Sequence, residues 1–135
     1  MYNLSKCFND KDVRPTVLIG AKSKRQLFSI KEFDAISNVH ISTEDGSFGE
    51  KGFLTQNTIL NNNDFDAILT CGPTIMMKAV SDIAKKKNLP CYVSLENRMA
   101  CGIGACLCCV VDSKEGNVCT CTEGPVFLSN ELKQW

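Results

Sequence analysis

The sequence has little that would direct it to nucleic acid or into a membrane. Its 15 lysines and arginines balance its 15 aspartates and glutamates, so no basic surplus favours nucleic acid or an anionic lipid surface. No stretch approaches the roughly 20 apolar residues that cross a bilayer. Residues 1–7 contain no apolar signal-peptide core. We therefore expect a cytoplasmic protein without a membrane segment.

Histidine is nearly absent. His40 is the only one in the chain, and a Rieske cluster takes two histidine ligands, so the chain alone cannot build such a centre. The rest of the composition is ordinary for a globular protein, with 44% apolar and 22% charged residues. A length of 135 residues predicts one compact domain, or one and a half small ones.

Strand-like and helix-like segments alternate over roughly the first ninety residues. Short apolar runs predict strands at 15–20, 38–42, 66–70 and 91–95. Helices are predicted between them at 2–10, 24–33, 52–60 and 74–87, the last with Thr74 as its N-cap. Such alternation is typical of parallel βαβ units in a doubly wound sheet.

The character of the sequence changes after Leu95, where glycine, cysteine and short β-runs replace the helices. The runs 107–112 and 117–120 could pair as a hairpin. We expect an α/β fold with a partial doubly wound parallel sheet over residues 1–95. A small β-rich module is expected over residues 96–135.

Cysteine is the residue that the chain has in excess. Six of its nine cysteines lie between residues 101 and 121, and Cys7, Cys71 and Cys91 are scattered. The odd number and the lack of a secretion signal argue against a disulfide framework. In a reducing compartment, clustered cysteines more often bind metal or carry out redox chemistry. For Cys7 and Cys91 we favour plain buried thiols.

The spacing within the cluster predicts its chemistry. Cys101, Cys106 and Cys109 form a C-x4-C-x2-C pattern with a distant fourth cysteine, which is the ligand spacing of plant-type [2Fe–2S] proteins. Gly102 and Gly104 would let the backbone wrap closely and turn amides toward the sulfurs.

The spacing leaves two questions about this cluster open. It does not separate Cys119 from Cys121 as the fourth ligand. Cys108 lies between two ligand positions and would point away from them. Structural zinc in an interaction module is the alternative, but zinc usually takes two C-x2-C pairs, and Cys119 and Cys121 are too close to form the second.

Two segments of the sequence carry a family resemblance. The run Ser94-Leu-Glu-Asn-Arg-Met-Ala-Cys-Gly-Ile-Gly-Ala-Cys106 closely resembles the electron-transfer subunit of type B dihydroorotate dehydrogenase, and so does Cys121-Thr-Glu-Gly-Pro-Val-Phe127. In that family the fourth ligand directly precedes the acidic-Gly-Pro-Val-Phe segment. The resemblance therefore implies one ligand set, with Cys108 and Cys119 as extra thiols: Cys101, Cys106, Cys109 and Cys121.

The resemblance extends over nearly the whole chain. Residues 17–24 and 43–52 are similar to parts of the family's NAD-binding domain, and so is the turn Cys71-Gly72-Pro73. The wider ferredoxin-reductase superfamily shares this turn and places it near the nicotinamide. The alternative for the turn is a tight strand-to-helix connection that needs glycine and proline for its shape alone.

The resemblance implies an electron relay in pyrimidine biosynthesis. NAD(H) would exchange a hydride with FAD, and single electrons would pass through the [2Fe–2S] cluster to FMN in a partner subunit that oxidises dihydroorotate. This chain would be a component of that enzyme and not a catalyst alone. The corresponding subunit of a ferredoxin:NADP or sulfide-type oxidoreductase is a related alternative. Glu96 and Arg98 lie beside the loop that holds the clustered cysteines. These two residues could form an ion pair, orient the loop or contact a flavin.

The sequence departs from the family at its start. The FAD-binding barrel and the glycine-rich turn that open the family's pattern have no counterpart here, so the chain resembles the C-terminal half of such a subunit. We expect no tight FAD binding by this chain alone, and NAD binding is in doubt. A further chain could supply the FAD domain. The sheet would also keep an open edge, which favours a homodimer.

Overall fold

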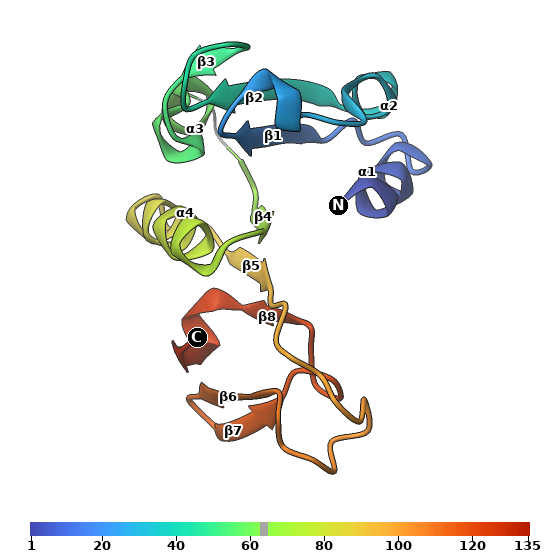
Figure 1. Ribbon diagram of the computed structural model, residues 1–135, viewed down its shortest axis with the longest axis vertical. Helices are drawn as coiled ribbons and strands as arrows, with labels where there is room; N and C mark the ends of the chain where they lie inside the picture. The colour runs from blue at the N-terminus through green and yellow to red at the C-terminus, as the bar shows by residue number, and fades with distance from the viewer. Residues whose placement is uncertain (63–64) are drawn as a thin grey trace. The chain divides into compact units, whose positions relative to one another are not determined.

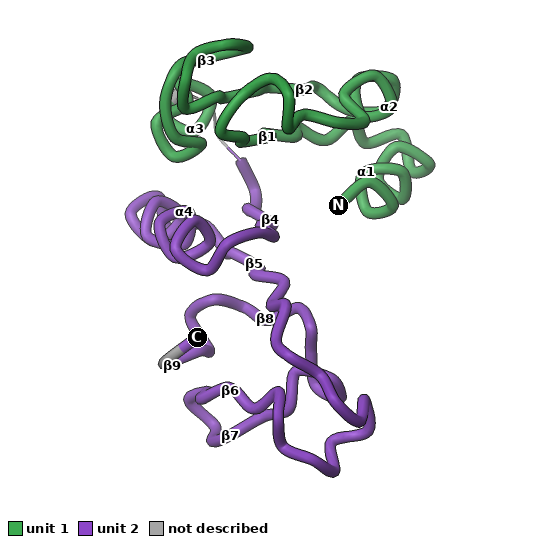
Figure 2. The backbone as a smooth tube through the Cα atoms, in the orientation of Figure 1, with its two compact units in different colours: residues 1–63 green, residues 64–135 purple. Residues whose placement is uncertain are grey.

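The computed structural model describes residues 1–62 and 65–135, and it divides into two compact units, 1–63 and 64–135 (Figure 2). Each unit is described by itself. The division into modules expected after residue 95 stays a prediction. Within the described residues, no helix is long and apolar enough to cross a membrane.

The first unit holds a small parallel sheet in the order β1-β2-β3. Its elements, shown in Figure 1, are α1 (Tyr2–Asn9), β1 (Thr16–Ala21), η1 (Lys24–Gln26), α2 (Ile30–Ile36), β2 (Asn38–Thr43), β3 (Glu50–Lys51), η2 (Leu54–Gln56) and α3 (Thr58–Asn62). Apolar residues face each other across the central pair, with Val17 opposite Val39 and Ile19 opposite Ile41.

The helix expected over residues 24–33 is divided in the structure. A 3-10 turn at Lys24–Gln26 precedes α2, and between them Ser29 adopts a left-handed backbone with φ 53°. A left-handed residue cannot continue a right-handed helix, so α2 starts only after it. The ring of Tyr2 on α1 then packs edge-to-face on Phe33 of α2, with 5.4 Å between ring centroids.

The second unit holds two further sheets. Its elements are β4 (Ile68–Cys71), α4 (Thr74–Lys86), β5 (Cys91–Ser94), β6 (Val110–Ser113), β7 (Gly116–Cys119), β8 (Val126–Leu128), η3 (Ser129–Glu131) and β9 (Leu132–Gln134). One sheet has the order β4-β5-β8 and the other has the order β7-β6-β9. Strands β4 and β5 are parallel, whereas β8 joins β5 antiparallel. The predicted α/β fold is confirmed, although its parallel strands fall into separate small sheets.

Helix α4 packs against the sheet by one apolar stripe. Met77, Val80 and Ala84 are buried at the three- and four-residue spacing of a helix face. Buried and more exposed residues alternate along β5, as in a strand with one covered face, and Cys91 and Val93 are the buried ones. The N-cap predicted at Thr74 is wrong by one residue, because extended Pro73 takes that position and Thr74 begins the helix.

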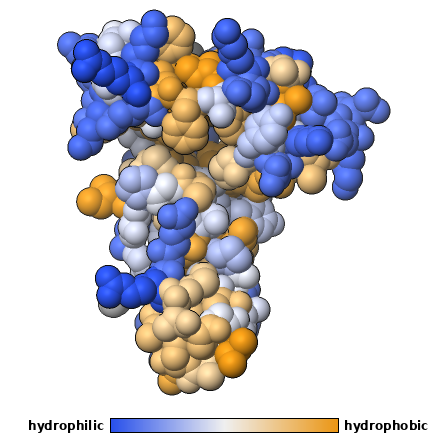
Figure 3. All heavy atoms as spheres, turned by 45° about the vertical axis from the view of Figure 1, so that its right-hand side comes forward, coloured by the Kyte–Doolittle hydropathy of each residue, from blue (hydrophilic) through white to orange (hydrophobic). Residues whose placement is uncertain are grey.

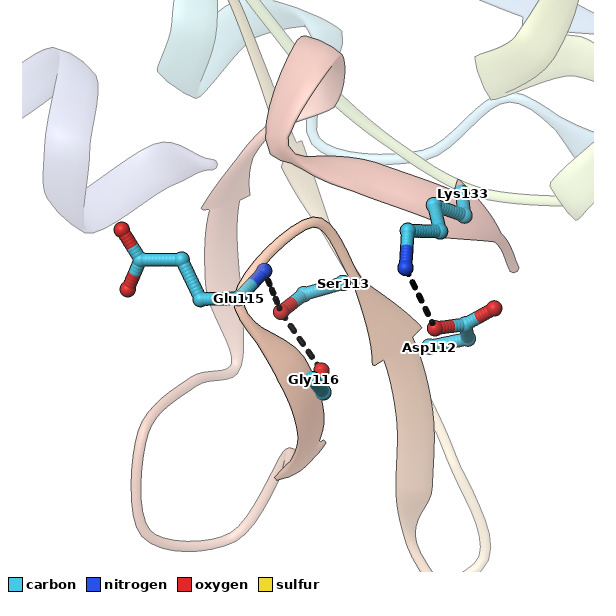
Figure 4. Close-up of polar contacts among 5 residues, drawn as sticks. All are labelled: Asp112, Ser113, Glu115, Gly116 and Lys133. Atoms are coloured by element: carbon cyan, nitrogen blue, oxygen red, sulfur yellow. Dashed lines mark hydrogen bonds and ion pairs between the residues drawn. The ribbon is translucent and has the colours of Figure 1, made fainter.

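The hairpin of β6 and β7 is the frame of the cysteine-rich region, and its prediction is confirmed. Figure 4 shows its turn, where the hydroxyl of Ser113 donates to the Gly116 carbonyl at 2.6 Å and accepts from the Glu115 amide at 3.2 Å. An ion pair of 3.6 Å between Lys133 and Asp112 links β9 to β6. The hairpin brings the segment before β6 beside the end of β7.

Candidate metal centre

A long loop, residues 96–109, connects β5 to β6 and carries four of the cysteines; we call it the cysteine loop (Figure 1). Its backbone is left-handed at Gly102 (φ 72°), Gly104 (φ 77°) and Leu107 (φ 57°). Glycine adopts this conformation without a steric penalty, whereas leucine does not. The loop therefore winds tightly, as the two glycines predicted.

The sulfur of Cys101 accepts hydrogen bonds from amides of its own loop. The N–H groups of Ile103 and Cys106 lie 3.5 and 3.4 Å from it. Both bonds stabilise the thiolate, and the bond from Ile103 contributes more than the bond from Cys106. They lower the pKa of Cys101 to about 6. Sequence reasoning assigned such amides to the glycines, whereas Ile103, directly after Gly102, and Cys106, two residues after Gly104, supply these two.

Cys109 and Cys121 form a second pair of thiols. The amide and the thiol of Cys121 both hydrogen-bond to the Cys109 sulfur, which lowers the pKa of Cys109 and raises that of Cys121. The amide of Gly104 in turn favours the Cys121 thiolate. Cys109 is buried, with 2% of its surface exposed. The structure thus joins the last residue of the cysteine loop to the residue that the family resemblance selected.

The backbone beside Cys109 is held by residues that the sequence analysis missed. Its carbonyl accepts the Thr120 amide at 3.0 Å, the Thr120 hydroxyl at 2.9 Å and the Asn97 side-chain amide at 3.5 Å. Thr120 is fully buried. It lies in the turn that follows β7, and its position between Cys119 and Cys121 was the available signal.

The two remaining thiols of the cluster differ in their placement. Cys108 is exposed whereas Cys109 is buried, as expected for neighbours that point in opposite directions. A hydrogen bond with Cys106 and the nearby thiolate charges raise the pKa of Cys108. The Cys119 sulfur lies 4.0 Å from the Gly104 carbonyl oxygen. Partial burial and the charge of Cys109 raise the pKa of Cys119.

The scattered cysteines do not all behave alike. Cys91 is buried in β5, as predicted, and burial raises its pKa. The prediction that Cys7 is buried is wrong. In α1 only Ser5 is buried, and Cys7 lies on the side of the helix that faces solvent.

The thiols of the predicted ligand set meet in two pairs, Cys101 with Cys106 and Cys109 with Cys121. Among the described residues, no group of three His, Cys, Asp or Glu side chains is gathered around a single point.

The predicted turn Cys71-Gly72-Pro73 connects β4 to α4 in the second unit. Gly72 has φ 150°, and a Cβ there would come within 2.7 Å of the Met76 methyl carbon. The Cys71 thiol lies 3.9 Å from a carboxylate oxygen of Glu96 and donates to it. The Glu96 carboxylate therefore faces the turn, and its roles toward the loop and a flavin stay predictions.

A cavity of about 430 Å³ opens beside this turn. Its walls come from the ends of β4 and β5, the first turn of α4 and the last residue of the chain: Gly72, Pro73, Thr74, Met77, Leu95, Glu96, Asn97 and Trp135. The carboxyl ends of parallel strands are where open α/β sheets bind ligands. Asn97 also reaches the Cys109 carbonyl, so one residue contacts both the cavity and the cysteine loop.

The cysteine loop exposes several apolar side chains. Met99, Ile103 and Leu107 are exposed, with 75% of the Ile103 side chain accessible. In Figure 3 hydrophobic residues gather at the lower end of the view. Exposed apolar patches on otherwise polar proteins mark surfaces that contact a partner or a ligand.

Comparison with protein families gives an independent view of the same region. Residues 96–133 match the iron–sulfur cluster binding domain of dihydroorotate dehydrogenase B. The chain is 44% identical to a probable dihydroorotate dehydrogenase B (NAD(+)) electron transfer subunit of Methanocaldococcus jannaschii, over 93% of this chain and 49% of that protein. It is 41% identical to the corresponding subunit of Bacillus pumilus, over 98% of this chain and 52% of that protein.

A solved structure also resembles the fold. It is that of an NADH-dependent reduced ferredoxin–NADP oxidoreductase, described in connection with flavin-based electron bifurcation. The TM-score is 0.84 at 29% identity, and the match covers 98% of this chain and 49% of that one. The chain spans about half the length of the curated relatives that it matches.

Proposed function

Because the chain is related to the electron transfer subunits of dihydroorotate dehydrogenase B over nearly its whole length, we propose that it transfers electrons through a [2Fe–2S] cluster. Cys101 and Cys106 would hold one iron, and Cys109 and Cys121 the other. The observation that carries the proposal is the arrangement of these four thiols as two contacting pairs within one tight loop and hairpin.

When bound, the cluster supplies one-electron chemistry, which suits a relay between carriers that handle one or two electrons. The chain's own groups prepare the site for it. Amides of Ile103 and Cys106 donate to the Cys101 sulfur and stabilise its negative charge. The hydrogen bonds from Thr120 to the Cys109 carbonyl fix the second pair to the hairpin. Amide donors to ligand sulfurs also raise a cluster's reduction potential.

The proposed partner is the FMN-containing catalytic subunit of a dihydroorotate dehydrogenase in the cytoplasm. Oxidation of dihydroorotate would occur there and not on this chain. The exposed apolar residues of the cysteine loop, Met99, Ile103 and Leu107, support a contact surface next to the thiols. A chain that carries an FAD domain is a further proposed partner.

We assign the nicotinamide side of the relay to the turn Cys71-Gly72-Pro73. The cavity of about 430 Å³ beside it is large enough for a ring-sized ligand. The Glu96 carboxylate lines this cavity and accepts a hydrogen bond from the Cys71 thiol at 3.9 Å. FAD and NAD belong to the full electron transfer path, and this turn alone would contact only a small part of either cofactor.

A second candidate function comes from the solved structure that resembles the fold. That protein is a ferredoxin–NADP oxidoreductase, so the chain could instead belong to a reductase that exchanges electrons with ferredoxin. The higher identity of 44% to the dihydroorotate dehydrogenase B subunit, compared with 29% here, favours the first candidate.

The test is anaerobic purification followed by iron and acid-labile sulfide analysis, with visible and EPR spectra before and after dithionite. About two irons and two sulfides per chain, with an EPR signal that develops on reduction, would support the cluster. Bound zinc, or no metal after anaerobic reconstitution, would contradict it. Reduction of the loaded chain by dihydroorotate through an FMN catalytic subunit, compared with reduction by reduced ferredoxin, distinguishes the two candidates.

A further inference from the structure

A fifth thiol lies inside the proposed cluster site and has no part in the ligand set. Cys119 ends strand β7, two residues before Cys121. Thr120 between them is fully buried and turned toward the Cys109 carbonyl. Thr120 and Cys121 lie in the turn that follows β7, where the Thr122 and Glu123 amides donate to the Cys119 carbonyl at 3.1 and 2.9 Å. This turn keeps Cys119 and Cys121 close together at the end of the hairpin.

The contacts of the two thiols overlap. The Cys119 sulfur lies 4.0 Å from the carbonyl oxygen of Gly104, the residue whose amide faces the Cys121 sulfur. Both thiols are also in hydrogen-bonding contact with the Cys109 sulfur. Cys119 and Cys121 thus approach the same ligand of the second pair and the same glycine of the cysteine loop.

From this geometry we infer that Cys119 is a reserve ligand, able to take the fourth ligand position in place of Cys121. The change would form an iron–sulfur bond to Cys119 and break the one to Cys121. Cys119 would release its thiol proton and the freed Cys121 thiolate would take one up, so the charge of the site is unchanged. No oxidant or reductant is required.

Cys108 provides the matched comparison. It is also a thiol beside the site, and it contacts Cys106. It lies on the cysteine loop and is exposed, whereas Cys119 is half-buried on the hairpin next to the second pair. A reserve role that depends on position should therefore belong to Cys119 and not to Cys108.

The inference rests on the proposed function, and the experiment keeps the two apart. We would purify the full chain anaerobically as wild type, Cys121→Ala, Cys121→Ala/Cys119→Ala and Cys121→Ala/Cys108→Ala. Iron, sulfide, visible and EPR spectra would be measured for each. Alanine is used because a serine oxygen can itself bind iron. Circular dichroism would check that each variant is folded.

We expect Cys121→Ala to keep a cluster with shifted visible bands and g-values. The added Cys108→Ala change should leave that cluster in place, and the added Cys119→Ala change should remove it. A folded Cys121→Ala variant that has lost its cluster would overturn the reserve role, and so would loss that follows Cys108 instead of Cys119. A wild-type chain without any cluster would overturn the proposed function itself.

Discussion

The carbonyl oxygen of Cys109 accepts two hydrogen bonds from one residue, the amide of Thr120 at 3.0 Å and its hydroxyl at 2.9 Å. These bonds connect the last residue of the cysteine loop to the end of the hairpin. Because the two residues flank β6 and β7, respectively, the bonds also close the open end of that ladder. Thr120 thereby sets the distance between the two ligand-bearing segments.

Replacement of Thr120 by valine should weaken this connection. Valine has the same shape but no hydroxyl, so the Cys109 carbonyl loses one donor, at a cost of about 1 kcal/mol in the free energy of unfolding. We expect faster cluster loss in air as well. Thr120→Ser keeps the hydroxyl and is the control. Urea unfolding and the decay of visible absorbance measure the two effects, and equal behaviour of the two variants would contradict the assigned role.

Gly104 should tolerate substitution less well than Gly102. Both have left-handed backbones, where alanine costs about 1–2 kcal/mol. A Cβ on Gly104 would also lie 3.3 Å from the Thr122 methyl, whereas a Cβ on Gly102 has no neighbour within 4 Å. Gly104→Ala should therefore lose more iron than Gly102→Ala after identical reconstitution. The reverse order would show that crowding at Thr122 does not shape the loop.

In the cluster-free protein, alkylation of Cys101 should follow a pKa of about 6. The pKa is lowered, so the thiolate is present above that pH and is lost as the pH falls through it. Iodoacetamide labelling between pH 5 and 8, read by mass spectrometry, should show this midpoint. Exposed Cys7 serves as the accessible reference, and buried Cys91, whose pKa is raised, should label slowly at every pH. Cluster reconstitution should protect Cys101 but not Cys7.

Removal of any one of the three proposed ligands on the cysteine loop should abolish the cluster. Cys101→Ala, Cys106→Ala and Cys109→Ala each leave one iron with a single thiolate. Cys108→Ala is the control, since this residue is outside the proposed set. Iron and sulfide content of the four variants, prepared side by side, provides the measurement. Loss of the cluster on removal of Cys108, or its full retention without Cys109, would contradict the assignment.

Self-association is expected through open sheet edges. In the described part of the chain, β1 pairs only with β2, and β4 pairs only with β5. Leu69 on β4 is 37% exposed, so Leu69→Lys adds a charge at that edge and should shift the oligomers toward monomers. Ile75→Lys, on exposed surface of α4, is the matched charge control. Light scattering over a range of concentrations would show whether the edge variant alone responds.

A match to an iron–sulfur domain could be predicted from the sequence because the cysteine spacing is local. Cys101, Cys106 and Cys109 lie within nine residues, and the intervening glycines allow the left-handed turns that the loop makes. The parallel pairing of the strands was also predictable, from helices and strands that alternate. Each of these features depends on neighbours in the sequence.

Features that depend on distant contacts were not predictable. Asn97 and Thr120 meet at the Cys109 carbonyl only after the hairpin has formed. The contact between Cys71 and Glu96 joins the ends of two strands that are 25 residues apart. The division of the expected helix at Ser29 and the exposure of Cys7 likewise depend on how each helix packs, which propensity alone does not determine.

Strand β5 has neighbours on both sides, and this affects how uniform the proposed electron transfer would be from molecule to molecule. Val93 lies opposite Thr70 of β4 on one side and Phe127 of β8 on the other, and the Leu95 amide donates to the Pro125 carbonyl at 2.9 Å. The turn after β4 and the segment after Cys121 are therefore joined through a hydrogen-bonded sheet and not through a free tether. Electron tunnelling rates decline steeply with distance. A site built on such a frame would give every molecule nearly the same transfer time, whereas a floppy connection would spread those times broadly.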